Sequence, residues 1–254
     1  MNEYNKTFYS GQMAGSMLSA EHIIPQVIDM LSPIQVKSVV DFGCGVGGWL
    51  SYFLRLNPSG SVFGLDTGKP DKKQLQISEK DYKRVDLSKA VNLNRKFDLC
   101  MSLEVAEHIP SECAENFVDN LCRHADIILF SAAIPGQGGI GHINEQLLSY
   151  WVEKFRKRSY ILYDIVRPCI WEDRDIEVHY KQNVVLFIKD SVELENCSFR
   201  KKSQKALVDI AHPDFVYVSE KMQNDRLINR SYLYIHHKKL FFALRKIKHI
   251  FISK

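Results

Sequence analysis

The sequence predicts an α/β fold in which a doubly wound, mostly parallel sheet is covered by helices on both faces. Short apolar runs rich in β-branched and aromatic residues alternate along the chain with segments of helical period. This alternation is typical of βαβ units, which place helices on both faces of a parallel sheet. The chain of 254 residues is long enough for one such domain with extensions.

We expect seven strands and four main helices. The strands are expected at KSVVDF (37–42), SVFGLD (61–66), a short run ending in RVDL (84–87), KFDLCMS (96–102), ADIILFS (125–131), YILYDIV (160–166) and NVVLFI (183–188). The helices are expected near 20–31, 47–55, 111–124 and 144–157, where apolar residues recur at helical spacing.

Composition divides the chain into three parts. Residues 1–190 contain the expected strands and helices, together with a helical N-terminal cap, and form the predicted domain. Residues 191–235 mix charged and small residues without a clean period, so we expect a peripheral extension there. Residues 236–254 hold six Lys/Arg and no acid, and their apolar residues recur at helical spacing, which predicts a basic amphipathic helix.

The overall composition excludes several classes of protein. Hydrophobic residues make up 45% and charged residues 25% of the chain, as in an ordinary globular protein rather than a disordered or fibrous one. The six cysteines form no C-x-x-C pair, and no signal peptide or long apolar run is present, so we expect a cytoplasmic protein with reduced thiols. Of the net charge of +4, six positive charges lie in residues 236–254, which leaves residues 1–235 mildly acidic and argues against a nucleic-acid partner.

A glycine-rich loop, VVDFGCGVGGW, follows the first expected strand and opens the next helix. It fits G-x-G-x-x-G of dinucleotide-binding folds through Gly43, Gly45 and Gly48. It also fits D-x-G-x-G-x-G of proteins that bind S-adenosylmethionine (SAM) through Asp41, Gly43, Gly45 and Gly47. Because a carboxylate favours the cationic amino-acid end of SAM and repels a pyrophosphate, Asp41 favours SAM. A nicotinamide-dependent oxidoreductase is a distant alternative.

Two further acids follow the next expected strands. Asp66 ends SVFGLD, where its carboxylate can accept hydrogen bonds from both ribose hydroxyls. Asp86 in RVDL can meet the adenine amino group. Cys44, Leu87 and Ser102 complete the set of residues that we expect to bind the cofactor.

Several blocks of the sequence resemble a known family. VVDFGCGVGGWL, FDLCMSLEVAEHIP, LFSAAIPGQGGIGHINEQLLSYWVEKF and RPCIWEDRDIEVHYKQNVVLF are similar to successive blocks of a bacterial family of class I SAM-dependent methyltransferases, often found beside surface-glycan biosynthesis functions. The resemblance covers about residues 8–190. It implies a Rossmann-like fold and SAM as the cofactor, but a fold alone does not identify the acceptor.

A second group of candidate residues follows the expected strand 96–102. In SLEVAEHIP (102–110), Glu104, Glu107 and His108 can converge on one point if they begin a helical turn, and His142 in GGIGHINEQ can reach the same sheet edge. These four residues resemble the E-x-x-E-H…H arrangement of small-RNA 3′-terminal 2′-O-methyltransferases and, less closely, that of ubiquinone-pathway O-methyltransferases. The resemblance implies a divalent metal, Mg or Mn.

Three interpretations of this group stay open. A metal held by Glu104, Glu107, His108 and His142 would orient an acceptor hydroxyl and lower its pKa. Alternatively, the site is metal-free and His142 is the general base, with His108 and Glu104 beside it. In the third interpretation the stretch is structural. Both functional interpretations favour an oxygen acceptor, since a hydroxyl needs deprotonation more than an amine or a thiol does.

The sequence therefore predicts a SAM-dependent methyltransferase that O-methylates a sugar hydroxyl of a surface-polysaccharide or related glycan precursor. The alternatives are an RNA 2′-O-methyltransferase, an O-methyltransferase of quinones or secondary metabolites, and a non-catalytic SAM-binding protein. A basic helix at 236–254 would bring the protein to the inner face of the membrane, which suits a lipid-linked glycan acceptor.

Overall fold

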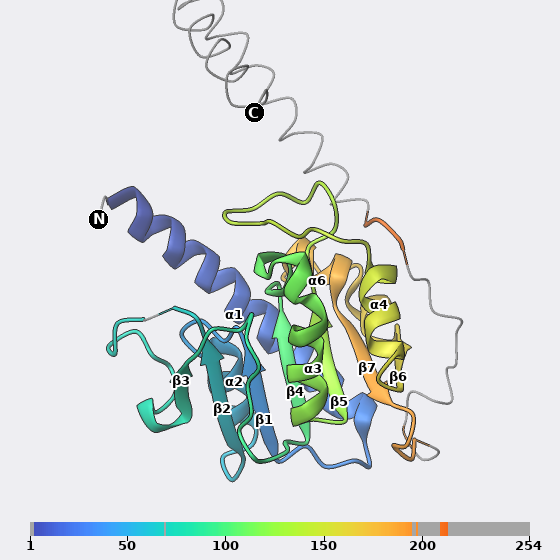
Figure 1. Cartoon of the computed structure of the whole chain (residues 1–254). Coiled ribbons are helices and arrows are strands. Elements are labelled where there is room, and N and C mark those ends of the chain that lie inside the picture. Colours follow the sequence, from blue (N-terminus) through green and yellow to red (C-terminus); the bar gives the residue numbers. More distant parts are fainter. Residues whose placement is uncertain (1–2, 69, 195–196, 198–208, 213–254) are drawn as a thin grey trace, which may run out of the picture. The chain divides into compact units, whose positions relative to one another are not determined.

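The protein folds into a seven-stranded sheet with helices on both faces (Figure 1), seen in a computed structural model that describes residues 3–68, 70–194, 197 and 209–212. The strands are β1 (Ser38–Phe42), β2 (Ser61–Asp66), β3 (Tyr82–Arg84), β4 (Leu99–Leu103), β5 (Ile127–Ser131), β6 (Tyr160–Tyr163) and β7 (Val185–Lys189). Their order is β3-β2-β1-β4-β5-β7-β6, and only β7 runs antiparallel to its neighbours. The predicted fold class is thus confirmed.

Six α-helices and three 3₁₀ turns connect the strands in the described part of the chain. The helices are α1 (Glu3–Leu31), α2 (Gly48–Leu56), α3 (Ala114–His124), α4 (Leu148–Arg156), α5 (Arg167–Ile170) and α6 (Val178–Asn183). The 3₁₀ turns are η1 (Glu79–Asp81), η2 (Ala106–His108) and η3 (Ser111–Cys113). None of the described helices combines the length and the apolar character needed to cross a bilayer.

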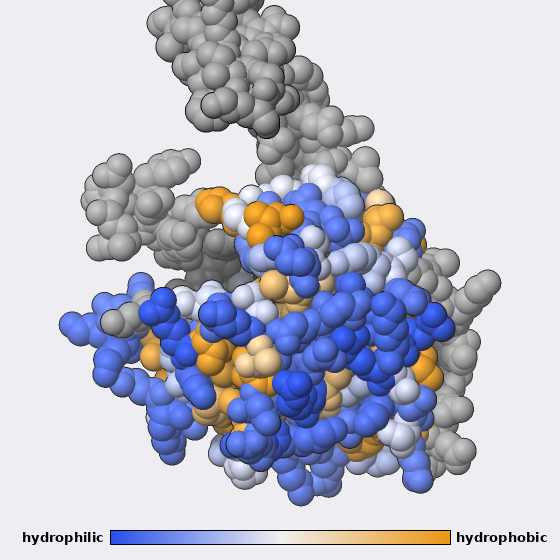
Figure 2. All heavy atoms as spheres, viewed as in Figure 1, coloured by the Kyte–Doolittle hydropathy of each residue, from blue (hydrophilic) through white to orange (hydrophobic). Residues whose placement is uncertain are grey.

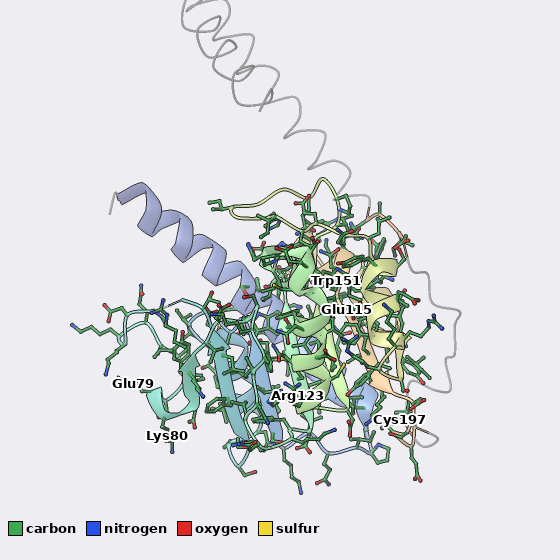
Figure 3. The ribbon with its side chains drawn as sticks, viewed as in Figure 1. Glu79, Lys80, Glu115, Arg123, Trp151 and Cys197 are labelled. Atoms are coloured by element: carbon green, nitrogen blue, oxygen red, sulfur yellow. The ribbon has the colours of Figure 1, made fainter. Side chains whose placement is uncertain are left out.

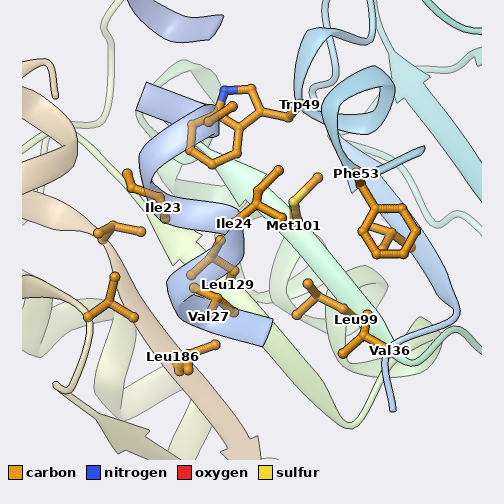
Figure 4. Packing of buried hydrophobic residues seen from close by; sticks show 14 of the residues in the cluster. Ile23, Ile24, Val27, Val36, Trp49, Phe53, Leu99, Met101, Leu129 and Leu186 are labelled. Atoms are coloured by element: carbon orange, nitrogen blue, oxygen red, sulfur yellow. The ribbon is translucent and has the colours of Figure 1, made fainter. Parts of the chain in front are cut away.

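Alternate residues of the central strands face opposite layers, because successive side chains of a strand point to opposite sides. Val39 of β1 and Leu129 of β5 pack in the layer that contains α1, α2, α5 and α6. Val40 and Ile128, the sequence neighbours of these two residues, pack in the layer that contains α3 and α4. Figure 4 shows residues of α1, among them Ile23, lying against β5 and β7. The central strands are therefore buried on both faces, which explains their continuous apolar sequence.

Helix α4 is fastened to α3 through a cluster of charges. Glu115 of α3 accepts hydrogen bonds from Lys154 (3.0 Å), Lys157 (3.1 Å) and Arg158 (2.9 Å). The bond from Lys154 is the largest of several effects that lower the pKa of Glu115 to about 2. Figure 3 labels Glu115 of α3 and Trp151 of α4. These contacts fix the C-terminal end of α4 against α3.

The helix expected at 144–157 begins only at Leu148. The amides of Ile143 and Asn144 instead donate hydrogen bonds to the carbonyl of Glu107, at 3.0 and 2.9 Å, so a distant partner holds this segment in a loop. Helices α5 and α6 were not expected. They are four and six residues long, which is too short to show a helical period in the sequence.

The domain extends beyond the boundary expected at residue 190. Its compact unit ends at His212, whose amide donates a hydrogen bond to Gln182 Oε1 at 2.6 Å. Leu194 and Cys197 are also buried in the core. The start and the end of the segment 191–212 therefore belong to the domain. The rest of the predicted extension and the predicted helix at 236–254 lie outside the described residues.

Candidate active site

The glycine-rich loop after β1 has a backbone that glycine adopts most readily. Gly43, Gly45 and Gly47 have φ angles of 96°, 54° and 83°, in the left-handed region. A Cβ atom on Gly43 would lie 2.2 Å from the side chain of Val105, so the loop packs directly against the segment that follows β4. A Cβ atom on Gly45 would meet nothing within 4 Å. The turn at Gly45 therefore faces open space that a ligand can approach closely.

Asp66, the last residue of β2, is joined to this loop. Its Oδ2 accepts a hydrogen bond from the amide of Gly45 at 2.8 Å, and its Oδ1 accepts one from the amide of Gly68 at 2.6 Å. Each carboxylate oxygen has a second lone pair, so Asp66 keeps acceptor capacity for a ligand. The expected ribose contact of Asp66 stays a prediction, and its position beside the loop is compatible with it.

Asp41 of β1 is a buried acid at the base of the loop. It is paired with Gly64 of β2 and Met101 of β4, and only 5% of its surface is exposed. Burial, and then the nearby charge of Asp66, raises the pKa of Asp41 to about 8. Burial also raises the pKa of the Cys44 thiol well above its usual range, so this residue is a neutral part of the loop wall. A buried acid of this kind is neutralised by a proton or by a bound cation.

Two of the residues expected to bind the cofactor have buried side chains, and their cofactor contacts stay predictions. The side chain of Leu87 lies in the core beside α3, 2% exposed, so only its backbone can face a ligand. Ser102 is fully buried and donates a hydrogen bond to the carbonyl of Phe42 at 3.0 Å, so its hydroxyl joins β4 to β1. Asp86 is exposed beyond β3, and its Oδ1 accepts a hydrogen bond from Ser88 at 2.6 Å. Its expected adenine contact stays a prediction.

Three of the four residues expected to converge do so. Glu107 and His108 lie in η2, and His142 comes from the loop 134–147. Ligand atoms of all three residues lie within 4.8 Å of one another. The Nε2 atom of His142 is 3.8 Å from Glu107 Oε1, and the two imidazole rings meet edge to face with centroids 4.9 Å apart.

Glu104 does not join this cluster. Its carboxylate accepts hydrogen bonds from Gln137 Nε2 at 2.6 Å and from Asn183 Nδ2 at 3.0 Å. The expectation assumed that Glu104 begins a helical turn, but its φ is 56° and that of Val105 is −128°, so the backbone is not helical there. Glu104 instead connects the loop 134–147 to α6.

The carboxyl group of Glu107 is buried where its ionised form is electrostatically unfavourable. The residue is 0% exposed, and neither carboxylate oxygen has a partner at full hydrogen-bond geometry among the described residues, while the backbone amides of Glu107 and Ala133 act to lower its pKa. Burial, and then the charge of Glu104, raises the pKa of Glu107 well above its usual range. A carboxylate in this position needs a proton or a cation beside it.

The two imidazoles of the cluster are oriented by local acceptors. Nδ1 of His108 is 3.1 Å from the carbonyl of Gly141, and Nδ1 of His142 is 2.9 Å from the carboxylate of Glu145. Since both partners accept hydrogen bonds, each Nδ1 carries the proton, and a neutral ring leaves Nε2 with a free lone pair. The cluster therefore presents two imidazole nitrogens and one carboxylate, which can hold a divalent metal or accept a proton.

Sequence reasoning missed Gln137, Glu145 and Asn183, which support these groups. Of these three residues, only Glu145 could have been found from the sequence, because an acid three residues after His142 in a glycine-rich segment can contact the histidine.

The loop that carries His142 turns several apolar side chains to solvent. Ile140 is 79% and Ile143 is 65% exposed, whereas the side chain of His142 is only 12% exposed. Figure 2 shows that the visible face is otherwise mainly hydrophilic, with separate apolar patches. The loop therefore directs His142 inward between two outward-facing isoleucines.

Part of the chain is similar to known proteins. Residues 19–133 match a family described as a methyltransferase domain. This region includes the glycine-rich loop and η2 but ends before His142. Among curated proteins, the chain is similar to protein 235L of Invertebrate iridescent virus 6, whose name calls it a putative methyltransferase. The two are 26% identical over 146 residues, 56% of this chain and 52% of that protein, so the chain spans about half the length of this relative.

Solved structures of methyltransferases share the fold. The sugar N-methyltransferase KedS8 from Streptoalloteichus sp. ATCC 53650 has a TM-score of 0.55 and 13% identity, with 74% of this chain and 94% of that chain covered. DesVI from Streptomyces venezuelae has a TM-score of 0.53 and 12% identity, with 74% and 99% covered. The likeness concerns the fold alone. Residues 19–133 thus match a methyltransferase domain family, and the described residues share the Rossmann-like fold of these solved methyltransferases.

Proposed function

We propose that this protein is a SAM-dependent methyltransferase that transfers a methyl group to oxygen. One observation carries the proposal. The acid-flanked glycine loop and the cluster of Glu107, His108 and His142 lie at the same edge of the sheet, where Gly43 packs against Val105. In open α/β sheets, ligands bind at the carboxyl ends of the strands. A cofactor in the loop would therefore lie next to groups that can take a proton.

The acids of the loop suit SAM. Asp41 is a buried acid whose ionised form an ammonium group would stabilise, and Asp66 offers free acceptor sites to a diol. The open turn at Gly45 lets a ligand approach the backbone. When bound, SAM supplies a methyl group on a sulfonium, an activated donor. A pyrophosphate would instead oppose the ionisation of Asp41, which argues against a nicotinamide cofactor.

The cluster suits a hydroxyl acceptor. A hydroxyl must lose its proton as the methyl group arrives, and the free Nε2 lone pair of His142 can accept that proton. The carboxylate of Glu145 then stabilises the imidazolium that forms. Holding the hydroxyl close and aligned is the main contribution that the protein can make to this displacement. An amine acceptor would need less help with its proton.

A divalent metal would be held by Glu107, His108 and His142. The unpartnered, buried carboxylate of Glu107 and the two free Nε2 atoms fit such a group. A metal supplies Lewis acidity, which lowers the pKa of a bound hydroxyl. Two imidazoles with one carboxylate suit Mn better than Mg, which prefers oxygen ligands. If the site is metal-free, His142 is the base.

We extend the proposal to a glycan acceptor, a sugar hydroxyl of a surface-polysaccharide or related precursor, handled at the inner face of the membrane. The sequence resemblance supports the acceptor, and the basic composition of residues 236–254 supports the membrane contact. Flotation with anionic liposomes tests the membrane contact. Full-length protein should float, and removal of residues 236–254 should abolish flotation, while equal flotation of both forms would contradict it.

Transfer of isotope-labelled methyl from SAM into a fractionated cell extract tests the function. The purified protein should place label in a glycan or glycolipid fraction, and His142→Ala should reduce the label strongly. Loss of transfer with a chelator, restored by Mn, would assign the metal to the site, whereas persistent transfer would assign the proton to His142 alone. Label confined to RNA would contradict the glycan acceptor, and absence of transfer to every fraction would favour a non-catalytic SAM-binding protein.

A further inference from the structure

We propose that Glu145 is the positioning residue of the site: its carboxylate fixes the ring of His142 with the proton on Nδ1, and so presents a bare Nε2 to Glu107. The chemical meaning of this arrangement rests on the proposed function, because Nε2 would hold the metal or accept the proton of the acceptor. The orientation itself is a property of the protein without ligands and can be tested separately.

The carboxylate of Glu145 has three donors around it. Its Oε1 is 2.9 Å from His142 Nδ1 and accepts a hydrogen bond from the amide of Gly138 at 2.7 Å. Its Oε2 accepts one from the amide of Gly136 at 2.8 Å. A carboxylate that already accepts hydrogen bonds from two backbone amides is an acceptor toward the ring as well, so the shared proton belongs to Nδ1 of His142.

The backbone around Glu145 is shaped for this contact. Gly136 and Gly138 have φ angles of 88° and 70°, a conformation that other residues rarely adopt, and this turns both amides toward the carboxylate. A Cβ atom on Gly139 would lie 2.2 Å from His142 Nε2, so the absence of a side chain there makes room for the ring. The glycines of this loop therefore serve both Glu145 and His142.

Glu107 also contacts the loop 134–147, at residues 143 and 144. Its backbone carbonyl accepts hydrogen bonds from the amides of Ile143 and Asn144, the two residues between His142 and Glu145. The carboxylate of Glu107 is 3.8 Å from His142 Nε2. One residue thus fixes the backbone of the segment and also faces the ring that the segment carries. Glu145 completes this arrangement, because it selects which ring nitrogen faces Glu107.

A histidine without such a partner favours the opposite tautomer, since free imidazole side chains in water carry the proton mainly on Nε2. In that tautomer His142 could neither bind a metal nor accept a proton through Nε2. Loss of Glu145 should therefore switch the tautomer of His142, whereas a merely structural role in the loop would not require it.

The test is ¹⁵N-histidine NMR of the full chain without metal, at a pH at which the imidazoles are neutral. The tautomer of each ring is read from long-range ¹H–¹⁵N correlations, and His142 is assigned by comparison with His142→Gln. The wild type should show the Nδ1–H form. Glu145→Gln should keep that form, because the amide oxygen still accepts, and Glu145→Leu should lose it. Glu112→Leu, at an exposed acid outside the loop, is the control and should change nothing.

An Nε2–H form in the wild type would overturn the proposal without any variant, and so would an Nδ1–H form that persists in Glu145→Leu. The outcome is independent of the methyltransferase assay. The predicted tautomer in a protein that transfers no methyl group would leave the role of Glu145 standing and refute the proposed function. Methyl transfer by a wild type with the Nε2–H form would refute the role of Glu145 and leave the proposed function standing.

Discussion

The side chain of Asp66 is hydrogen-bonded to the amide of Gly45 at 2.8 Å, which joins the end of β2 to the loop after β1. This contact fixes the turn at Gly45, which faces open space. A site that is already shaped requires little ordering when a ligand binds, so more of the interaction energy appears as affinity. The acids and the glycines therefore act as one unit.

The affinity for SAM should rise with pH up to about 8, the value to which the pKa of Asp41 is raised. Below that pH Asp41 carries a proton, and an ammonium group favours the ionised form. Calorimetric titration of SAM should show up to about tenfold tighter binding per pH unit below the pKa. Asp41→Asn should bind more weakly, and without this pH dependence. A wild-type affinity that is independent of pH would contradict the assignment of Asp41.

Metal affinity should distinguish Glu107 from Glu104. Glu107→Gln should weaken binding of Mn²⁺ by at least about tenfold, because it removes the charged ligand of the cluster. Glu104→Gln should change it by less than about threefold, since Glu104 is bound to Gln137 and Asn183. Free Mn²⁺ is measured by electron paramagnetic resonance. Equal losses in the two variants would restore Glu104 as a ligand.

Glu107→Gln should also stabilise the metal-free protein at neutral and alkaline pH. The pKa of Glu107 is raised in the folded state, so its contribution to the free energy of unfolding is full below pH about 4.5 and decreases as pH rises above this value. Glutamine does not ionise, so this decrease is absent from the variant. The free energy of unfolding of Glu107→Gln should therefore exceed that of the wild type by about 1–3 kcal/mol at pH about 8 and differ little from it at pH about 4. Urea denaturation at both pH values measures the free energy of unfolding. A variant less stable than wild type at the higher pH would refute the ionisation argument.

Glu104 should control the mobility of the loop 134–147. Glu104→Ala removes two hydrogen bonds, to Gln137 and Asn183, and should cost about 1–3 kcal/mol of stability. Hydrogen exchange of peptides from this loop should become faster, while that of the central strands changes little. Glu112→Ala serves as the exposed control. Unchanged exchange in the loop would mean that other contacts hold it.

The fold and the glycine loop could be predicted because their signals are local. Buried strands show as continuous apolar runs, and the loop is a contiguous motif between a strand and a helix. The start of α4 could not be predicted, because residues 143 and 144 are held by the carbonyl of Glu107, which is distant in the sequence. Short helices such as α6 leave no period to detect.

The candidate site was predictable only in part. Glu107, His108 and His142 were expected together and lie together, although their chemical roles stay predictions. Glu104 was placed wrongly because spacing along the sequence was taken to mean a helical turn, while the backbone at this residue is left-handed. The role of Glu145 depends on amides that point inward from a glycine-rich loop, which sequence spacing does not reveal.

The most direct test of the cofactor site is calorimetric titration of SAM into the wild type, Asp66→Ala and Asp71→Ala. Asp66→Ala loses a charged acceptor for the ribose and the bond to Gly45, so it should bind SAM at least about tenfold more weakly. Asp71→Ala, at an exposed acid in the segment after β2, should bind as the wild type does. Equal affinity of wild type and Asp66→Ala, or no binding of SAM to the wild type, would contradict the account.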